Sequence, residues 1–150
     1  MSRFRGKFEY SIDAKGRVSM PAKFRRVLNP EAQETFVICL TPNKCLRAYP
    51  LDAWEKYEDE LASRPETHDT LRFKRFLYDT AADSTLDKQG RILIAPNQIK
   101  LAGIAKEIIL VGHMGYIEMW AKEAYESYFL NMQDYDETYF KSVEAGLVAR

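Results

Sequence analysis

Short apolar runs separated by turn signals predict a succession of β-hairpins. Residues 36–40 and 46–49 form one pair of runs across a turn at 41–44, and residues 108–111 and 116–120 form another across a turn at 112–115. A further segment, 4–13, alternates loosely between polar and apolar side chains and is rich in aromatic residues, which favours one or two more strands.

Helical spacing occurs between these strands. Phe24, Val27 and Leu28 fall on one face of a helix that we expect to begin at Pro21, a residue suited to the first helical position, and to stop at Asn29-Pro30. Other apolar spacings predict helices over residues 53–62, 68–79, 96–103, 123–132 and 134–147. The mixture of hairpins and helices indicates an α+β fold.

One sequence pattern occurs twice. Residues 13–17 read DAKGR, and residues 87–91, 74 positions later, read DKQGR. Each copy follows a polar–apolar pair and precedes a short apolar run and then a proline, Pro21 or Pro96. These shared flanks favour an internal duplication. A half of this length buries little surface alone, so we expect the two halves to share one core. Because Pro96 lies one residue later in its copy than Pro21 does, the second helix is expected to start differently.

Each copy has the sequence of a tight turn. Asp13 and Asp87 occupy the first turn position, where a carboxylate accepts hydrogen bonds from the backbone, and Gly16 and Gly90 occupy the fourth. We therefore interpret these four residues as structural turn residues. A pair of catalytic carboxylates is the weaker interpretation of the two aspartates.

The arginine after each turn allows two interpretations. Arg17 and Arg91 would project from the end of a hairpin, where a planar guanidinium can bind a guanine edge or a phosphate. Alternatively, each arginine pairs with the aspartate of its own motif and stabilises the turn. The two interpretations are compatible, because an arginine held by a turn is also preorganised to bind a ligand.

The net charge is zero, but the charges are unevenly distributed. Residues 1–26 contain eight lysines and arginines against two carboxylates, and residues 118–150 are acidic. A basic end on a neutral protein is typical of a surface that binds a polyanion; the alternative is a solvated surface on which charges happen to cluster. Lys15, Lys23, Arg25 and residues 3–7 accompany the first motif, so we expect that copy to dominate any binding of nucleic acid.

Residues suited to catalysis or to metal binding are few. The four candidate zinc ligands match no familiar spacing; they are His68, His113, Cys39 and Cys45. No Walker loop, dinucleotide-binding glycine motif or nucleophile elbow is present. We therefore expect no enzymatic activity, no metal, no other cofactor and no small-molecule substrate.

The cysteines and the hydropathy of the chain bear on its location. Cys39 and Cys45 lie on opposed strands of one predicted hairpin, but we expect free thiols rather than a disulfide. No apolar run approaches the roughly 18 residues that a membrane-spanning helix needs, and the first residues lack the apolar core of a secretory signal. A cytoplasmic location without a membrane partner is expected.

In these motifs the chain resembles the MraZ family of bacterial transcriptional regulators. The resemblance rests on Phe4-Arg5-Gly6, the two motif blocks at 13–21 and 87–96, and the segments 110–112 and 118–120. It implies two tandem SpoVT/AbrB-like half-barrels packed as one pseudo-symmetric domain. The implied division is residues 1–63 and 81–133 for the two repeats, 64–80 for a linking helix and 134–150 for a C-terminal helix.

The same resemblance implies a function. It indicates a nucleoid-associated repressor that binds short direct repeats of double-stranded DNA upstream of its own operon, the division and cell-wall gene cluster, as a ring-like homo-oligomer. The alternative is an oligomeric scaffold of the same fold with weak, non-specific DNA binding. The implied DNA-binding residues are Arg3, Arg5, Lys7, Lys15, Arg17, Lys23 and, more weakly, Arg91.

An oligomer is also expected from the aromatic residues, which exceed what two small half-domains can bury. Those that we expect to be exposed are Trp54, Tyr57, Phe73, Phe76, Trp120 and Tyr125.

Overall fold

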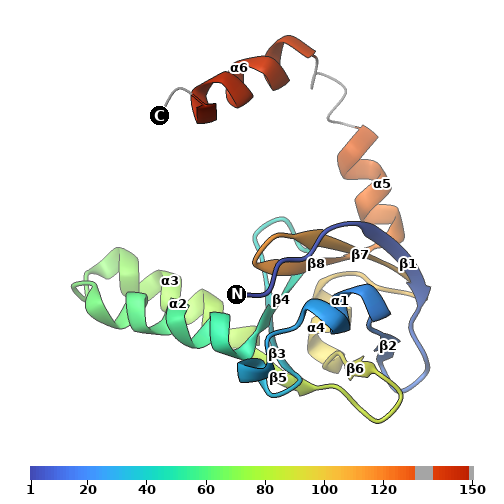
Figure 1. Ribbon diagram of the computed structural model, residues 1–150. Helices are drawn as coiled ribbons and strands as arrows, with labels where there is room; N and C mark the ends of the chain where they lie inside the picture. Colours follow the sequence, from blue (N-terminus) through green and yellow to red (C-terminus); the bar gives the residue numbers. More distant parts are fainter. Residues whose placement is uncertain (131–136, 149–150) are drawn as a thin grey trace.

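The computed structural model describes residues 1–130 and 137–148 (Figure 1). Its larger sheet is antiparallel and has six strands in the order β1-β7-β8-β4-β3-β5. These strands are β1 (Lys7–Ser11), β7 (Glu107–His113), β8 (Tyr116–Ala121), β4 (Leu46–Pro50), β3 (Thr35–Leu40) and β5 (Ala82–Thr85). The smaller sheet has two strands, β2 (Arg17–Ser19) and β6 (Arg91–Leu93).

Six α-helices and one short 3-10 helix accompany the sheets in the described residues. They are α1 (Ala22–Val27), η1 (Pro30–Ala32), α2 (Leu51–Ser63), α3 (His68–Thr80), α4 (Pro96–Leu101), α5 (Lys122–Leu130) and α6 (Glu137–Val148). The α+β class is therefore confirmed. The expected start of the last helix, at 134–136, lies outside the described residues, as does the expected end of the preceding helix.

The two repeats are intertwined rather than side by side. The first strand of each repeat pairs with a later strand of the other: β1 with β7, and β5 with β3. The expectation that Arg17 lies at the end of a hairpin, with the strand after the turn paired to the strand before it, is wrong, because β2 pairs with β6 of the second repeat. This exchange gives the halves one common core and a pseudo-symmetric arrangement.

The two short helices begin at equivalent positions. Pro21 caps α1 and Ala95 caps α4, and each stands four residues after its motif arginine. The expectation that the second helix starts differently is therefore wrong. Pro96 occupies the first helical position, where its missing N–H needs no partner, whereas Pro21 stands one residue earlier and only precedes its helix.

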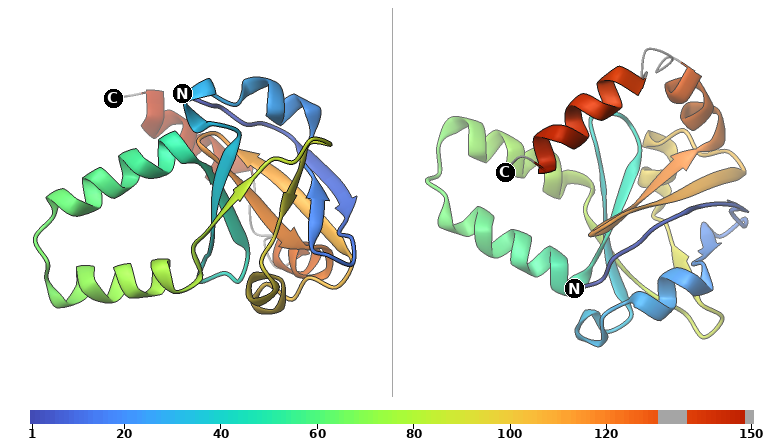
Figure 2. Two further views of the ribbon diagram at one scale, coloured as in Figure 1. Left: turned by 90° about the horizontal axis from the view of Figure 1, so that it is seen from below. Right: turned by 45° about the horizontal axis from the view of Figure 1, so that its top comes forward.

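The main core lies between the large sheet and the layer made by α1, α4, β2 and β6 (Figure 2). Apolar side chains fill it almost completely; the largest fully buried ones include Phe4, Phe24, Phe36, Ile92, Ile94 and Met119. The opposite face of the sheet carries two smaller clusters, one with Trp54 and Leu77 from α2 and α3 and one around Trp120 next to α5. Among the described residues, no helix is long and apolar enough to cross a membrane.

Trp54 and Trp120 are each only 3% exposed, so their expected exposure is wrong. Trp54 is carried by α2 and packs against Val37 and Leu77, and Trp120 on β8 packs against Tyr125 of α5. Tyr57 and Tyr125 are half-buried, while Phe73 and Phe76 on α3 remain 43% exposed.

Candidate nucleic-acid interface

The two motif turns have the same hydrogen bonds. Asp13 Oδ1 accepts from the backbone N–H groups of Lys15 (3.0 Å) and Arg17 (2.8 Å), and Asp13 Oδ2 lies 2.7 Å from Arg17 Nε. In the second turn Asp87 accepts from the corresponding backbone groups at 2.9 Å each and from Arg91 Nε at 2.9 Å. Each aspartate thus fixes both the backbone of its turn and the direction of its arginine.

The small sheet brings the two turns together. Strands β2 and β6 pair antiparallel, with Arg17 opposite Leu93 and Ser19 opposite Arg91. The carbonyl of Gly16 accepts from Ile94 N–H at 2.8 Å, and the carbonyl of Gly90 accepts from Met20 N–H at 2.9 Å. The backbone of each turn is therefore hydrogen-bonded to the chain that continues the short strand of the other repeat.

The two ion pairs are joined at one point. Arg91 Nη1 lies 4.0 Å from Asp13 Oδ2, so Asp13 has an arginine from each repeat beside it. The Arg17 and Arg91 side chains keep 33% and 26% of their surface exposed. The terminal nitrogens of Arg17 donate no hydrogen bond within residues 1–130 and 137–148, so they are free to donate to a ligand.

The charge state of the turns follows from these contacts. Hydrogen bonds from the backbone N–H of the motif arginine, followed by those from its guanidinium, hold the pKa of Asp13 and Asp87 below the ordinary value of 3.8. Both carboxylates therefore stay ionised near neutral pH. Their contribution to stability is present above pH 3.8 and is lost only as the pH falls through the lowered pKa values.

Arg25 completes this surface, although it is not among the DNA-binding residues that the resemblance implies. Its Nε donates to the carbonyl of Met20 at 3.1 Å, and its guanidinium packs within 2.9 Å of the position that a Cβ would take at Gly90. The equivalent residue of the second repeat, Ile99, packs on Gly16 instead. An arginine of the first repeat thus lies against the second turn, which only the exchanged pairing of β2 and β6 explains.

We call this surface the motif edge. It contains five cations and two carboxylates. Lys15 and Lys88 are exposed at the turns and form no ion pair among the described side chains, so their charges are not neutralised. The motif edge comprises Asp13, Lys15, Arg17, Arg25, Asp87, Lys88 and Arg91.

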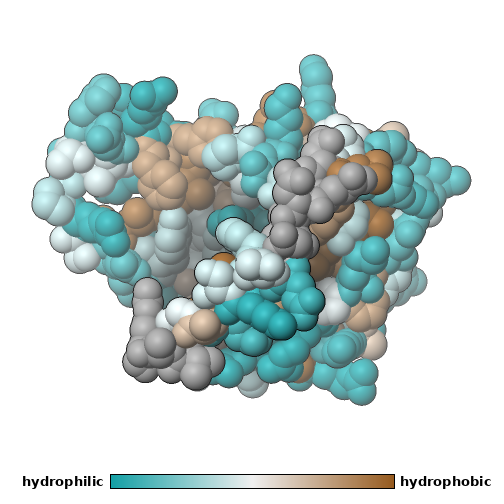
Figure 3. Space-filling view, turned by 90° about the horizontal axis from the view of Figure 1, so that it is seen from above, coloured by the Kyte–Doolittle hydropathy of each residue, from teal (hydrophilic) through white to brown (hydrophobic). Residues whose placement is uncertain are grey.

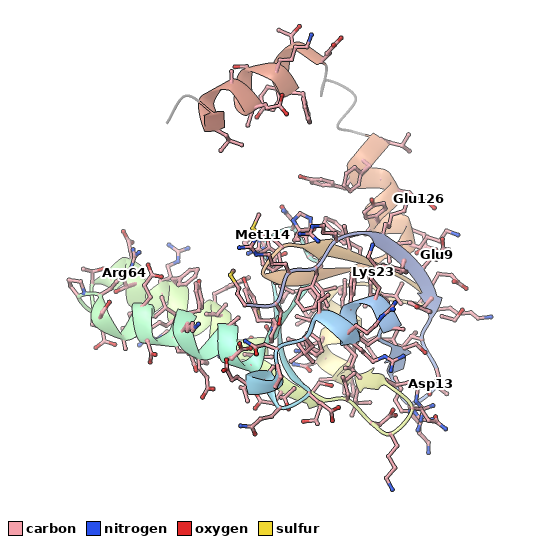
Figure 4. All side chains as sticks on the ribbon, viewed as in Figure 1. Glu9, Asp13, Lys23, Arg64, Met114 and Glu126 are labelled. Atoms are coloured by element: carbon pink, nitrogen blue, oxygen red, sulfur yellow. The ribbon has the colours of Figure 1, made fainter. Side chains whose placement is uncertain are left out.

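The remaining expected binding residues lie elsewhere. Arg3 and Arg5 flank Phe4, which bridges to Met114 at the other end of β1 from Asp13 (Figure 4). The ammonium of Lys7 lies 5.2 Å from the centre of the Tyr125 ring. Lys23 Nζ lies near Gly6 on the same side. The expected set therefore forms two groups rather than one cluster.

Both halves of the chain match one known protein family. The family model described as "MraZ protein, putative antitoxin-like" matches residues 3–76 and, a second time, residues 77–142. The chain belongs to the MraZ family. The double match agrees with the internal duplication that the two motifs predict.

Individual members of the MraZ family resemble the chain over most of its length. A protein named "Transcriptional regulator MraZ" from Acetivibrio thermocellus is 41% identical over 126 residues, which cover 83% of this chain and 85% of that relative. Proteins of the same name from Lachnoclostridium phytofermentans and Lactobacillus delbrueckii subsp. bulgaricus are each 40% identical, with the same coverage. The resemblance to the MraZ family is therefore confirmed.

Among the residues that the structure describes, the other polar groups of this MraZ-family chain form no comparable surface. His113 Nε2 lies 3.1 Å from Glu118 Oε1 and its ring stacks on Tyr116. Cys39 and Cys45 are free and buried, and Cys39 stands opposite Arg47 rather than Cys45. No group of three or more histidine, cysteine, aspartate or glutamate side chains in the described part of the chain is arranged to hold a metal ion.

Proposed function

We propose that the protein is a transcriptional regulator that binds double-stranded DNA in a sequence-specific manner through the motif edge. The names of its relatives support regulation of transcription. The observation that carries the proposal is the pair of arginines, each held in direction by an aspartate, in a surface with an excess of positive charge.

The geometry suits a base contact by Arg17. Its Nε is engaged by Asp13, and its two terminal nitrogens form no hydrogen bond among the described residues, which leaves them available as a fork. Such a fork can donate to O6 and N7 of a guanine in the major groove, which is wide enough to admit a two-stranded β-ribbon such as β2–β6. Because the ion pair already restricts the side chain, little conformational entropy is lost on binding.

The surrounding cations would contact phosphates. Lys15, Lys88 and Arg25 are exposed beside the two arginines and form no ion pair among the described residues. Phosphate contacts of this kind position a protein on DNA without reading its sequence. Arg91 is less exposed than Arg17 and lies close to two carboxylates, so we assign it a weaker contact.

The proposed biological role follows the MraZ resemblance. The protein would act in the cytoplasm, on the nucleoid, as a repressor of the division and cell-wall gene cluster, by occupying short direct repeats upstream of its own operon. One motif edge offers few contacts. A ring-like homo-oligomer that engages several repeats would make later contacts effectively intramolecular and raise the total affinity. The proposed role needs no catalysis.

The alternative proposal is an oligomeric scaffold with weak, non-specific DNA binding. Its support is the ion pairing itself, because each motif arginine already neutralises a carboxylate. The two proposals differ in one measurable quantity, the ratio of affinities for the upstream repeats and for random DNA.

Fluorescence anisotropy with a duplex from upstream of this protein's own gene, and with a shuffled duplex, tests the proposal. Arg17→Ala should lower the affinity for the upstream duplex by about 5–150-fold, corresponding to roughly 1–3 kcal/mol for a lost bidentate contact, and leave the shuffled duplex far less affected. Arg64→Ala, at the far end of the α2–α3 arm (Figure 4), is the matched control. Equal affinity of the wild-type protein for both duplexes would favour the scaffold.

A further inference from the structure

Helix α6 has an apolar face that its own chain leaves exposed. Tyr139, Phe140, Val143 and Leu147 fall on one side of the helix and are between 46% and 68% exposed. In Figure 1 the helix stands away from the large sheet. An amphipathic helix of this kind gains stability mainly by burying its apolar face against a partner.

A groove between α3 and strands β3 and β4 is the matching surface. It has a volume of about 400 Å³ and is lined by apolar side chains that include Leu40, Tyr49, Phe73, Phe76 and Leu77. Figure 3 shows hydrophobic residues gathered along the inner side of the arm formed by α2 and α3. We call this surface the arm groove.

The arm groove also carries basic groups. Arg47 and Arg72 line it, together with one carboxylate, Asp69. The guanidinium of Arg47 donates to Tyr49 Oη at 3.3 Å and lies over the Tyr116 ring, but its buried Nε has no hydrogen-bond partner among the described atoms. A buried donor without a partner is costly, so this groove is suited to an occupant that supplies an acceptor.

Helix α6 has acidic groups beside its apolar face. Glu137 and Glu144 lie at the edge of that face, and Glu137 pairs with Lys141 at 2.9 Å. Glu144 forms no ion pair within the described part of the chain. The helix and the groove are therefore complementary both in apolar area and in charge.

We propose that α6 of one copy of this chain binds in the arm groove of a second copy. Phe140, Val143 and Leu147 would pack against Phe73 and Phe76. Glu144 would approach Arg72 at the rim of the groove.

The two surfaces differ, so this contact is heterologous: each copy offers one helix and one groove. Repeated head to tail, such a contact closes into a ring or continues as a filament. The inference rests on the proposed function, in which an assembly engages several DNA repeats, and it names the surfaces that would hold that assembly together.

Light scattering on the full-length protein tests the proposal with two variants. Phe140→Asp removes the helix surface and Phe73→Asp removes the groove surface; both residues are exposed, so the fold should survive. Each variant alone should be a 17.4 kDa monomer, whereas the wild-type protein should be larger than a dimer. An equimolar mixture should form a dimer, because one intact helix and one intact groove remain.

The matched control is Ala145→Asp, which adds the same charge on the opposite side of α6. It should leave the size of the assembly unchanged. Leu147→Asp and Phe76→Asp repeat the test at neighbouring positions, and circular dichroism verifies that each variant is folded. Folded Phe140→Asp and Phe73→Asp proteins of wild-type size, or a mixture that stays monomeric, would overturn the proposal. A monomeric wild-type protein that Phe140→Asp destabilises would also overturn it and place α6 in its own groove.

DNA binding separates this inference from the proposed function. Phe140→Asp should bind a duplex with a single repeat as well as Ala145→Asp does, and should lose the additional affinity for a duplex with several repeats. Arg17→Ala should lose binding to the single repeat but keep its wild-type size. If Arg17→Ala binds normally while Phe140→Asp is monomeric, the proposed DNA surface fails and the assembly contact stands.

Discussion

Gly16 and Gly90 occupy the same turn position, yet a methyl group would meet different neighbours at the two sites. Both have positive φ, +85° and +74°, which side chains adopt at a cost. At Gly16 a Cβ would lie 2.8 Å from the carbonyl oxygen of Ile94, a backbone atom that cannot move alone. At Gly90 it would meet the guanidinium of Arg25, which ends a flexible side chain.

Gly16→Ala should therefore destabilise the protein more than Gly90→Ala. The strained φ alone is expected to cost of order 1–3 kcal/mol, and the contact with Ile94 adds to it. Gly103→Ala is the control for strain, because Gly103 has φ +67° and no atom within 4 Å of the Cβ position. Urea unfolding measures the three values. An equal loss for Gly16→Ala and Gly103→Ala would show that the close approach to Ile94 is unimportant.

Cys39 gives a second prediction for single residues. Burial raises the pKa of its thiol to about 11, and the thiolate is the reactive form. In a Cys45→Ala protein, labelling of Cys39 by iodoacetamide at pH 8 should be slow and should accelerate as the pH approaches 11. Between pH 9 and 11 the unfolded chain loses the thiol proton first, so stability should fall as the pH rises. Labelling at pH 8 as fast as in denaturant would contradict this.

At the scale of elements, local patterns predicted the hairpins β3–β4 and β7–β8 and the helices, but not which strands of one repeat pair with strands of the other. Apolar spacing and turn residues predict the tight turns, the strands 36–40 and 108–111, and the helix after each hairpin. They do not predict the pairing of β2 with β6, because Val18 and Ile92 are buried equally well by any partner strand. For the same reason the position of Arg25 beside Gly90 had no sequence signal.

Gln98 shows a second limit of sequence patterns. It occupies the position equivalent to Phe24, and both side chains are fully buried. Its Nε2 donates to the carbonyls of Ile38 and Thr80, at 2.9 and 2.7 Å, while its Oε1 accepts from Ala95 N–H at 3.2 Å. A single buried amide thus connects α4 to β3 and to the end of α3, and a polar residue in an amphipathic helix gives no sign of this.

Replacing Gln98 by leucine should be strongly destabilising, although the volume is similar. Three backbone groups would lose a partner, at roughly 1–3 kcal/mol for each group left buried and unsatisfied. Asn97→Leu, at an exposed neighbouring position, is the control. Calorimetry should find a large fall in melting temperature for the first change and a small one for the second. Similar melting temperatures for both variants would indicate that water or relaxation satisfies these groups.

At the scale of the molecule, the first repeat supplies three of the five cations of the motif edge. The difference is Arg25 on α1, because the equivalent residue of α4 is the uncharged Ile99. Pseudo-symmetry of the fold therefore coexists with asymmetry of charge. A DNA surface built this way depends on local charge, so the zero net charge of the chain does not weaken it.

Salt dependence of DNA binding measures that local charge directly. Each phosphate that the protein neutralises releases counterions, and the slope of log affinity against log salt steepens by about 0.9 for each contact in duplex DNA. Lys15→Ala should flatten the slope by about one unit for each engaged motif edge and weaken upstream and shuffled duplexes about equally. Lys7→Ala should change the slope less, because the ammonium of Lys7 is held over the Tyr125 ring. Lys56→Ala, on the exposed surface of α2, should leave the slope unchanged. If Lys7→Ala flattens the slope and Lys15→Ala does not, DNA binds at the opposite end of β1, beside Arg3 and Arg5, and the motif turns are structural.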